Sequence, residues 1–442
     1  MQTKVIDEPS DRQARSRACR LVNAHAEVNA VKTDGWKANL GRALASVLLA
    51  FFFCAPGNAA PKYKILHAFG KGNDGAGLWS PVTLDNTGNL YGATSGGGKY
   101  GYGTVFELTP HPNGHWSETI LHSFGNSYDP GGSEPNGGLV QDASGNWYGT
   151  TWSGGDYAYG TVFELAGGPG DWSESVLYSF GAKPDDGGDP VAGTVMDGSG
   201  NLYGTASTTA YELSLDPDTG SWSETILHRF GIKTGDGAAP YAGLILDTSG
   251  NLYGTTESGG IGCAGEGCGT VYELEHTANG WAETILHYFD NNDVDGYTPG
   301  NGALFMDSQG QLYGTTESGG SGTGSGTVFR LTPEADGHWK ETILYSFNSS
   351  GGSGPAGGVV MDNYGSLYGT ATSGGAPGCG VVYKLAPGPK DKWTYTVLHT
   401  FGYGNDGCMP TANLILDSQG NLYGDTAIGG AYGAGTVFEL TP

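Results

Sequence analysis

The chain has 442 residues, and its 45 acidic residues outnumber 20 basic ones, which gives a formal net charge of −25 at pH 7. This charge would repel phosphate groups, so the composition argues against nucleic acids and anionic membranes as partners. Two explanations of the acidic excess stay open: solubility outside the cell, and binding of cations.

The first 60 residues have the pattern of an export signal. An apolar run at residues 43–54 follows two basic residues and leads into small residues that end at Ala60. The run is too short to span a bilayer, so we favour a secretory signal peptide, cleaved after Ala59 or Ala60, over a buried or anchoring helix. Residues 1–36 are then a disordered leader or the result of a mis-assigned start. Cleavage predicts a secreted, periplasmic or extracellular protein with no segment inserted in a membrane.

Seven copies of one sequence pattern fill the chain between Leu66 and Leu440. Each copy contains versions of Trp-x-Glu-Thr-x-Leu-His-x-Phe, an apolar run that ends in Asp, Gly-Asn-Leu-Tyr-Gly-Thr, and Gly-Thr-Val-Phe-Glu-Leu. The central tyrosines are Tyr91, Tyr148, Tyr203, Tyr253, Tyr313, Tyr368 and Tyr423. Their spacing of about 55 residues indicates a modular array.

Each copy holds four short segments that are rich in β-branched and aromatic residues, which predicts four antiparallel strands. In the fourth copy these are residues 242–246, 252–256, 269–274 and 281–289, and an Asp-x-x-Gly hairpin joins the first two. Such a unit cannot bury both faces alone, and closing a stack of units into a ring protects the strand edges. We therefore predict that residues 61–442 form an all-β, seven-bladed β-propeller of four-stranded blades. A β-solenoid is the alternative, although solenoid coils repeat at only about 20–30 residues.

The two ends of the array are complementary. The chain begins with the Trp-to-Phe type of strand at residues 63–69 and ends with the third type at residues 435–440. If the apolar run that ends in Asp is the innermost strand, the last blade lacks its outer strand. We predict that the N-terminal strand joins the last blade and closes the ring.

The motifs Gly250 to Thr256 and Gly326 to Phe329 recur through the array and are specific through this recurrence. In these motifs the chain resembles the bacterial tandem-repeat proteins called GloVer repeats, which are related to the extracellular HAF repeats. The resemblance covers about residues 62–442 and implies an exported repeat protein. It brings no catalytic residues to this sequence.

Four cysteines remain after signal cleavage, an even number in a protein expected to meet an oxidising compartment. Cys263 and Cys268 share one Gly-rich loop, and Cys379 and Cys408 fall in loops expected on the same face of neighbouring blades. We predict the disulfides Cys263–Cys268 and Cys379–Cys408. Zinc is the rival interpretation, but no Cys-x-x-Cys is present and no histidine is near in sequence.

Departures from the repeat are more informative about function than its constant positions, since packing does not require them. Aromatic residues interrupt the Gly-rich loops of blades seven, one and two, which are neighbours in a closed ring. Exposed rings beside polar groups suit stacking on sugars, while the alternative is that they stiffen loops or cap blade edges. The candidate ligand-binding aromatics are Trp79, Tyr100, Tyr102, Trp152, Tyr157, Tyr159 and Tyr432.

Acidic connections between blades suggest a weak calcium candidate. Asn291, Asp293 and Asp295 have the spacing of the first half of a calcium loop, but the twelfth position is Gly302 instead of a bidentate Glu. An ordinary Asp-Gly turn is the alternative. No other cofactor is expected.

Little in the sequence indicates catalysis. Glu257 and Glu317 occupy the same loop position in adjacent copies, as duplication alone would produce, and we assign no catalytic residue. A histidine recurs at one outer-strand position and alternates with tyrosine, which indicates a half-buried, hydrogen-bonded packing residue instead of a general base. These residues are His67, His122, Tyr178, His228, His287, Tyr345 and His399.

We therefore expect a monomeric, noncatalytic binding or interaction module whose partner is an extracellular glycan or protein, with carbohydrate preferred. A polysaccharide-active hydrolase or lyase and a structural envelope or matrix protein are the alternatives.

Overall fold

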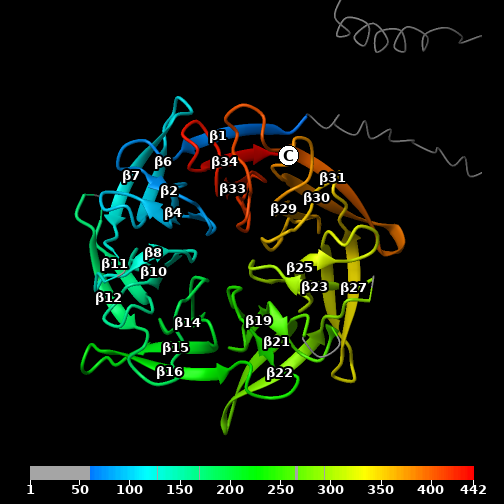
Figure 1. The fold of residues 1–442 in the computed structure, drawn as a ribbon, viewed down its shortest axis with the longest axis horizontal. Helices are drawn as coiled ribbons and strands as arrows, with labels where there is room; N and C mark the ends of the chain where they lie inside the picture. Colours follow the sequence, from blue (N-terminus) through cyan, green and yellow to red (C-terminus); the bar gives the residue numbers. More distant parts are fainter. Residues whose placement is uncertain (1–59, 127, 169, 264–266, 293) are drawn as a thin grey trace, which may run out of the picture. The chain divides into compact units, whose positions relative to one another are not determined.

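The computed structural model describes residues 60–442, apart from residues 127, 169, 264–266 and 293. The expected leader and signal peptide therefore lie outside the described residues, except for Ala60. Seven antiparallel sheets follow one another around a centre, each coloured by its place in the chain (Figure 1). The predicted seven-bladed β-propeller is confirmed. Within the described residues, no helix has the length and apolar character needed to cross a membrane.

Each blade is traversed from its innermost strand outwards, and its two-residue inner strand is much shorter than its outer ones. The first blade contains β3 (Thr83–Leu84), β4 (Leu90–Thr94), β6 (Thr104–Pro110) and β7 (Trp116–Ser123). The second contains β9 (Val140–Gln141), β10 (Trp147–Ser153), β11 (Thr161–Ala166) and β12 (Ser173–Ser179), with β8 (Ser133–Pro135) also paired to β10. The third contains β13 (Val195–Met196), β14 (Leu202–Thr205), β15 (Thr209–Leu215) and β16 (Trp222–Arg229).

The next three blades repeat this order. The fourth contains β18 (Ile245–Leu246), β19 (Leu252–Thr256), β21 (Thr270–Thr277) and β22 (Gly280–Tyr288). The fifth contains β24 (Phe305–Met306), β25 (Leu312–Gly319), β26 (Thr327–Pro333) and β27 (Trp339–Ser346), with β23 (Gly296–Pro299) also paired to β25. The sixth contains β28 (Val360–Met361), β29 (Leu367–Ala371), β30 (Val381–Gly388) and β31 (Lys392–Thr400), and a 3-10 turn, Pro389–Asp391, joins its last two strands. Two small ladders pair β2 (Gly75–Ala76) with β5 (Gly96–Gly97) and β17 (Gly237–Ala238) with β20 (Ser258–Gly259).

The seventh blade is built from both ends of the array. It contains β32 (Ile415–Leu416), β33 (Leu422–Thr426), β34 (Thr436–Thr441) and, as its outer strand, β1 (Lys62–Ala68). Strand β1 pairs antiparallel with β34, from Lys62 opposite Thr441 to Ala68 opposite Thr436. In Figure 1 the blue β1 lies beside the red β34. The predicted closure of the ring is confirmed.

In six of the seven copies the repeated Asp and Tyr form one hydrogen-bonded turn. In the fourth blade, Asp247 accepts hydrogen bonds from the backbone N–H groups of Ser249 and Asn251 at 2.8 and 2.9 Å. The hydroxyl of Tyr253 donates to Asp247 and to Glu273 of the next strand. The motif is therefore a structural unit that joins the first three strands of a blade.

The apolar core lies between consecutive blades. One cluster joins Tyr423 and Val437 of the seventh blade to Leu90, Phe106 and other residues of the first. A blade consequently has no core of its own, which explains why the units stack.

Candidate functional site

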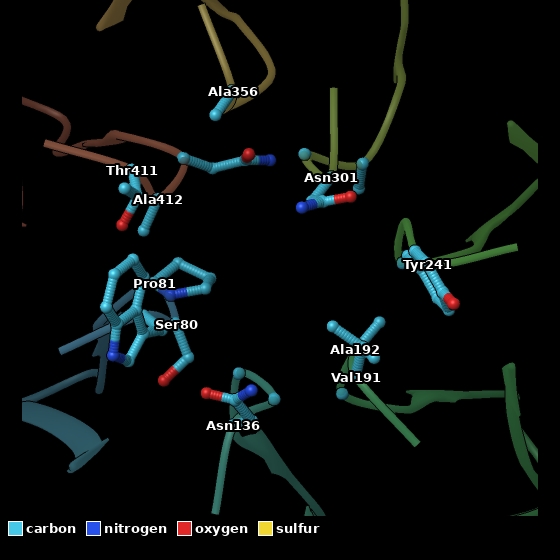
Figure 2. Close-up of a pocket in the computed structure, with 18 of the residues that line it drawn as sticks. Ser80, Pro81, Asn136, Val191, Ala192, Tyr241, Asn301, Ala356, Thr411 and Ala412 are labelled. Carbon is cyan, nitrogen blue, oxygen red and sulfur yellow. The ribbon is translucent and has the colours of Figure 1, made fainter. Parts of the chain in front are cut away.

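A cavity of about 530 Å³ lies at the centre of the ring, and every blade contributes to its wall. Figure 2 shows Tyr241 on the opposite side of the cavity from Ser80 and Pro81, with Asn136 and Asn301 on other parts of the wall. The residues that begin the innermost segment of each blade form much of this wall: Trp79, Asn136, Val191, Tyr241, Asn301, Ala356 and Thr411.

A repeated backbone arrangement holds these residues in place. In six blades a proline begins the inner segment, and the residue before that proline has a positive φ, as in Glu134 at 58° and Ala239 at 57°. Leu78 takes the place of the proline in the first blade, and Gly77 before it has a φ of 70°. In five of these six blades the residue before the proline donates its N–H to the preceding blade, as Glu134 does to the carbonyl oxygen of Tyr102 at 2.9 Å. Left-handed non-glycine residues cost about 1–2 kcal/mol each, and such strain gathers at functional sites.

Polar atoms of the cavity wall lack partners. Four buried atoms have no hydrogen-bond partner among the described residues: Ser80 Oγ, Asn136 Oδ1, Thr194 Oγ1 and Thr411 Oγ1. A buried polar group without a partner costs about 1–3 kcal/mol, so these atoms are suited to bind a ligand or water.

The wall carries little charge. Among the described residues that line the cavity, Glu317, in β25, is the single charged side chain. Burial, and then the charge of Glu257, raise the pKa of Glu317. One carboxyl group does not supply the pair that glycoside hydrolysis ordinarily uses.

The recurring histidines lie far from this cavity, in the outer strands at the junctions between blades. His67 Nε2 lies 3.1 Å from Asp74 Oδ2, and His399 Nε2 lies 3.0 Å from Asp406 Oδ2. The rings are half-buried or buried. Four of them, His67, His228, His287 and His399, contact the aspartate of the following loop through Nε2.

The repeated glutamate of the next blade completes several of these junctions. Glu118 Oε2 lies 3.7 Å from His67 Nε2, and burial, followed by a hydrogen bond and the charge of Asp74, raises the pKa of Glu118 to about 8. Burial and then Asp295 raise the pKa of Glu341 to about 9 in the same way. The ionised form of these glutamates is therefore unfavourable unless a cation lies beside it, and otherwise the carboxyl group holds a proton.

The sequence of the repeat also matches the profile of one known family. The profile of the Gloeobacter/Verrucomicrobia repeat matches residues 51–266, 209–390 and 324–442, which overlap and together cover most of the chain.

The chain belongs to the Gloeobacter/Verrucomicrobia repeat family.

Solved structures similar to this repeat protein share its fold at low sequence identity. Virginiamycin B lyase from Staphylococcus aureus is 13% identical with a TM-score of 0.51, and the match covers 86% of this chain and 99% of the lyase. PorZ, a bacterial surface component of the type-IX secretion system of Porphyromonas gingivalis, is 15% identical with a TM-score of 0.51, over 85% of this chain and 48% of PorZ. No curated protein sequence matches the chain. At these identities the similarity shows the fold alone.

The structure of this repeat protein exposes all seven candidate aromatics but separates them. Trp79 is 46% exposed and lines the central cavity. Tyr100 lies in a groove at the outer junction of the first and second blades, and Tyr159 lies in a groove at the next junction. The other exposed candidates are Tyr102, Trp152, Tyr157 and Tyr432. The seven candidate aromatics are thus divided between the cavity and the grooves between blades, and their role in ligand binding stays a prediction.

The weak calcium candidate is only partly described, because Asp293 lies outside the described residues. Asn291 is exposed. Asp295 is buried, and its Oδ2 accepts a hydrogen bond from the N–H of Asp290 and lies 3.3 Å from His287 Nε2. Its carboxylate therefore belongs to a junction with the next blade.

Both predicted disulfides are present in the repeat protein. Cys263 and Cys268 are bonded within one loop, with Cα atoms 5.6 Å apart. Cys379 and Cys408 are bonded between the sixth and seventh blades, with Cα atoms 4.6 Å apart.

Sequence reasoning missed most of the cavity. Tyr241, Asn136 and Thr411 occupy one repeat position, directly after the proline, and a different residue stands there in almost every copy. That variation beside a constant proline was the available signal.

Proposed function

We propose that this protein is an extracellular binding module that takes a neutral, polyhydroxylated ligand, with a carbohydrate preferred, in its central cavity. The observation that carries this proposal is that aromatic side chains and unpartnered polar groups line the same cavity. Trp79 and Tyr241 can stack on the apolar face of a sugar ring. Ser80, Asn136 and Thr411 carry buried polar atoms that have no partner among the described residues, and a small side-chain rotation would present these atoms to the hydroxyl groups of the sugar.

The charge of the wall supports a neutral ligand. Anionic sugars would meet the net charge of −25 and the carboxyl of Glu317 without a cation on the described wall to offset them. The expected export signal and the two disulfides support a site of action outside the cytoplasm.

Calorimetry with the purified chain and a panel of neutral mono- and oligosaccharides tests the proposal. We expect Trp79→Ala and Tyr241→Ala each to weaken binding by about 2- to 13-fold or more, since a stacked aromatic contact is worth about 0.5–1.5 kcal/mol beyond its buried area. Trp152→Ala is the matched control, because Trp152 is 44% exposed but is not among the cavity-lining residues.

Two results would count against the proposal, the first against the cavity as the binding site and the second against a noncatalytic role. Unchanged affinity in both cavity variants, with a loss in Trp152→Ala, would place binding on the loop aromatics. Turnover of a retained sugar that disappears in Glu317→Gln would favour the hydrolase or lyase alternative.

A further inference from the structure

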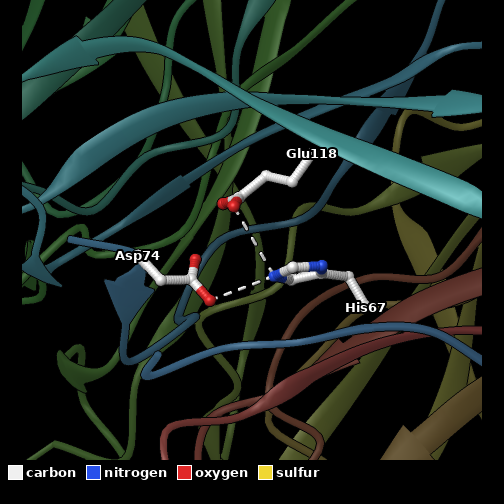
Figure 3. Close-up of side chains that lie close together, drawn as sticks. All are labelled: His67, Asp74 and Glu118. Atoms are coloured by element: carbon white, nitrogen blue, oxygen red, sulfur yellow. Dashed lines mark hydrogen bonds and ion pairs between the residues drawn. The ribbon is translucent and has the colours of Figure 1, made fainter. Parts of the chain in front are cut away.

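Three of the blade junctions bring together a histidine, an aspartate and a glutamate whose ligand atoms lie within 4.8 Å of one another. In each, the histidine comes from an outer strand, the aspartate from the loop that follows it, and the glutamate from the outer strand of the next blade. The clusters are His67, Asp74 and Glu118; His228, Asp236 and Glu283; and His287, Asp295 and Glu341. Figure 3 shows the first, with both carboxylates directed at the same ring nitrogen.

The second cluster is the most enclosed. The side chains of His228, Asp236 and Glu283 are 8%, 1% and 10% exposed. His228 Nε2 lies 3.1 Å from Asp236 Oδ1 and 3.4 Å from Glu283 Oε2. Three polar side chains therefore converge in a space from which bulk water is nearly excluded.

The hydrogen bonds within the clusters do not use all of their oxygens. Glu283 Oε1 is buried and has no partner among the described residues, and the same holds for Glu118 Oε1 and Glu341 Oε1. Asp295, whose side chain is 8% exposed, has an unpartnered Oδ1. Two carboxylates and an imidazole that share a nearly water-free space are costly there unless a cation or a proton joins them.

We propose that each of these three clusters binds a divalent transition-metal ion of the zinc type, which joins one blade to the next. The ligands are the Nε2 atom of the histidine and one carboxylate oxygen each from the aspartate and the glutamate.

The distances and donor types favour this class of ion. The ligand atoms of the clusters are separated by 3.1 to 3.7 Å from the histidine nitrogen. A tetrahedral ion with bonds of about 2.0–2.1 Å separates its ligand atoms by roughly 3.4 Å. Calcium and magnesium prefer oxygen alone, whereas an imidazole nitrogen with carboxylates suits zinc and its neighbours in the first row.

The other junctions supply an internal comparison. Between the second and third blades a tyrosine replaces the histidine, and Lys183 Nζ lies 3.2 Å from Glu224 Oε2, so a side chain supplies the cation. At two further junctions a tyrosine replaces the glutamate: Tyr63 stacks on His399 with ring centroids 3.8 Å apart, and Tyr395 stacks on Tyr345 at 4.1 Å. At these three junctions the loss of a ligand coincides with a different way of filling the space, whereas the junction of His122, Asp129 and Glu174 keeps all three residue types without bringing their ligand atoms within 4.8 Å of one another.

Metal content and titration test the proposal. The purified chain is stripped with a chelator, titrated with ZnCl₂ by calorimetry, and assayed for bound metal after gel filtration. We expect three equivalents of Zn²⁺, and two in each of Glu118→Gln, Glu283→Gln and Glu341→Gln. Cobalt(II) provides a second measurement, because a tetrahedral N,O site gives visible absorption that each variant should reduce by about one third.

A matched control comes from the same repeat position. Glu224→Gln changes the equivalent glutamate at the junction where Tyr178 replaces the histidine, so this variant should keep three equivalents. Lys233→Ala tests whether the exposed Lys233, near the second cluster in sequence, competes as a cation; metal binding there should persist or become tighter.

Three results would overturn the proposal. These are fewer than one equivalent of bound metal, an equal loss in Glu224→Gln, and an unchanged melting temperature with and without Zn²⁺ while the Glu→Gln variants become more stable at pH 8. The last result would mean that each carboxyl pair holds a proton instead of a metal ion.

Discussion

The closure of the ring by β1 can be tested through Phe69, which follows that strand. Phe69 is fully buried, and its ring centroid lies 4.9 Å from that of Phe106 in the first blade. Replacement of a buried phenylalanine by alanine costs about 3–5 kcal/mol, which multiplies the unfolded fraction by about 10² to 10³ or more. Phe69→Ala should therefore lower the free energy of unfolding in urea by about 3–5 kcal/mol.

Phe289→Ala is the matched variant. Phe289 occupies the same repeat position, is fully buried and packs on Phe329 at 5.2 Å, so its loss should cost a similar amount. Strand β22, which precedes it, is linked to its own blade by a short turn, whereas β1 is separated from β34 by almost the whole propeller. We therefore expect β1 to detach from β34 more easily in Phe69→Ala and not in Phe289→Ala.

Hydrogen exchange measured on the peptide 436–441 separates the two effects under conditions where both variants are folded. We expect β34 to exchange about 10² to 10³ times faster in Phe69→Ala, and close to the wild-type rate in Phe289→Ala. Equal protection of β34 in the two variants would refute the inference that the contacts of Phe69 hold β1 on β34 and so keep the ring closed.

Three further predictions concern stability. Burial, and then the charge of Asp129, raise the pKa of Glu174 from 4.5 to about 7. Because the unfolded chain releases this proton at a lower pH than the folded one, the folded state loses stability as the pH rises from 4.5 to 7. Glu174→Gln should therefore raise the free energy of unfolding by about 1–2 kcal/mol at pH 8, after allowance for solvent screening, and by almost nothing at pH 4.5. Asp425 is buried, both of its carboxyl oxygens lack a partner among the described residues, and burial raises its pKa. Asp425→Thr, which introduces the residue of most other blades, should raise the free energy of unfolding in urea by about 1–3 kcal/mol at pH 7 and by less toward pH 4. A destabilised variant would contradict this. Replacing Cys379 and Cys408 by serine should cost about 3–4 kcal/mol in denaturant, because the bond closes a segment with a sequence separation of 29, and an unchanged midpoint would show that the bond does not constrain the unfolded chain.

The fold could be predicted from the sequence because its determinants are local. The Asp-x-x-Gly turn, the strand alternation and the 55-residue period each lie within one copy, and the phase of the copies predicts that residues 63–69 complete the last blade. The disulfide pairs followed from loop positions within the same scheme.

The sites were harder to predict because they depend on how one blade is rotated against the next. Glu118 stands 51 positions after His67 in the sequence. Nothing local indicates that Glu118, the third residue of β7, contacts His67, the sixth residue of β1. Trp79 was found because it is aromatic in a place where most copies are not, whereas Asn136 and Thr411 are ordinary residues whose unpartnered atoms are visible only in the folded ring.

The glycine and proline contacts between blades have a consequence for how such proteins can diversify. A Cβ added at Gly103 would lie 2.6 Å from Pro135 Cδ, and the same close approach recurs at Gly160 with Pro190 and at Gly380 with Pro410. The backbone on either side of each cavity residue is thereby fixed, while the side chain after the proline is free to change. The residue after the proline can therefore be substituted in one blade at a time, in evolution or in design, without a change in the backbone of the blade. The effects of such substitutions on ligand binding should be additive where the positions lie far apart.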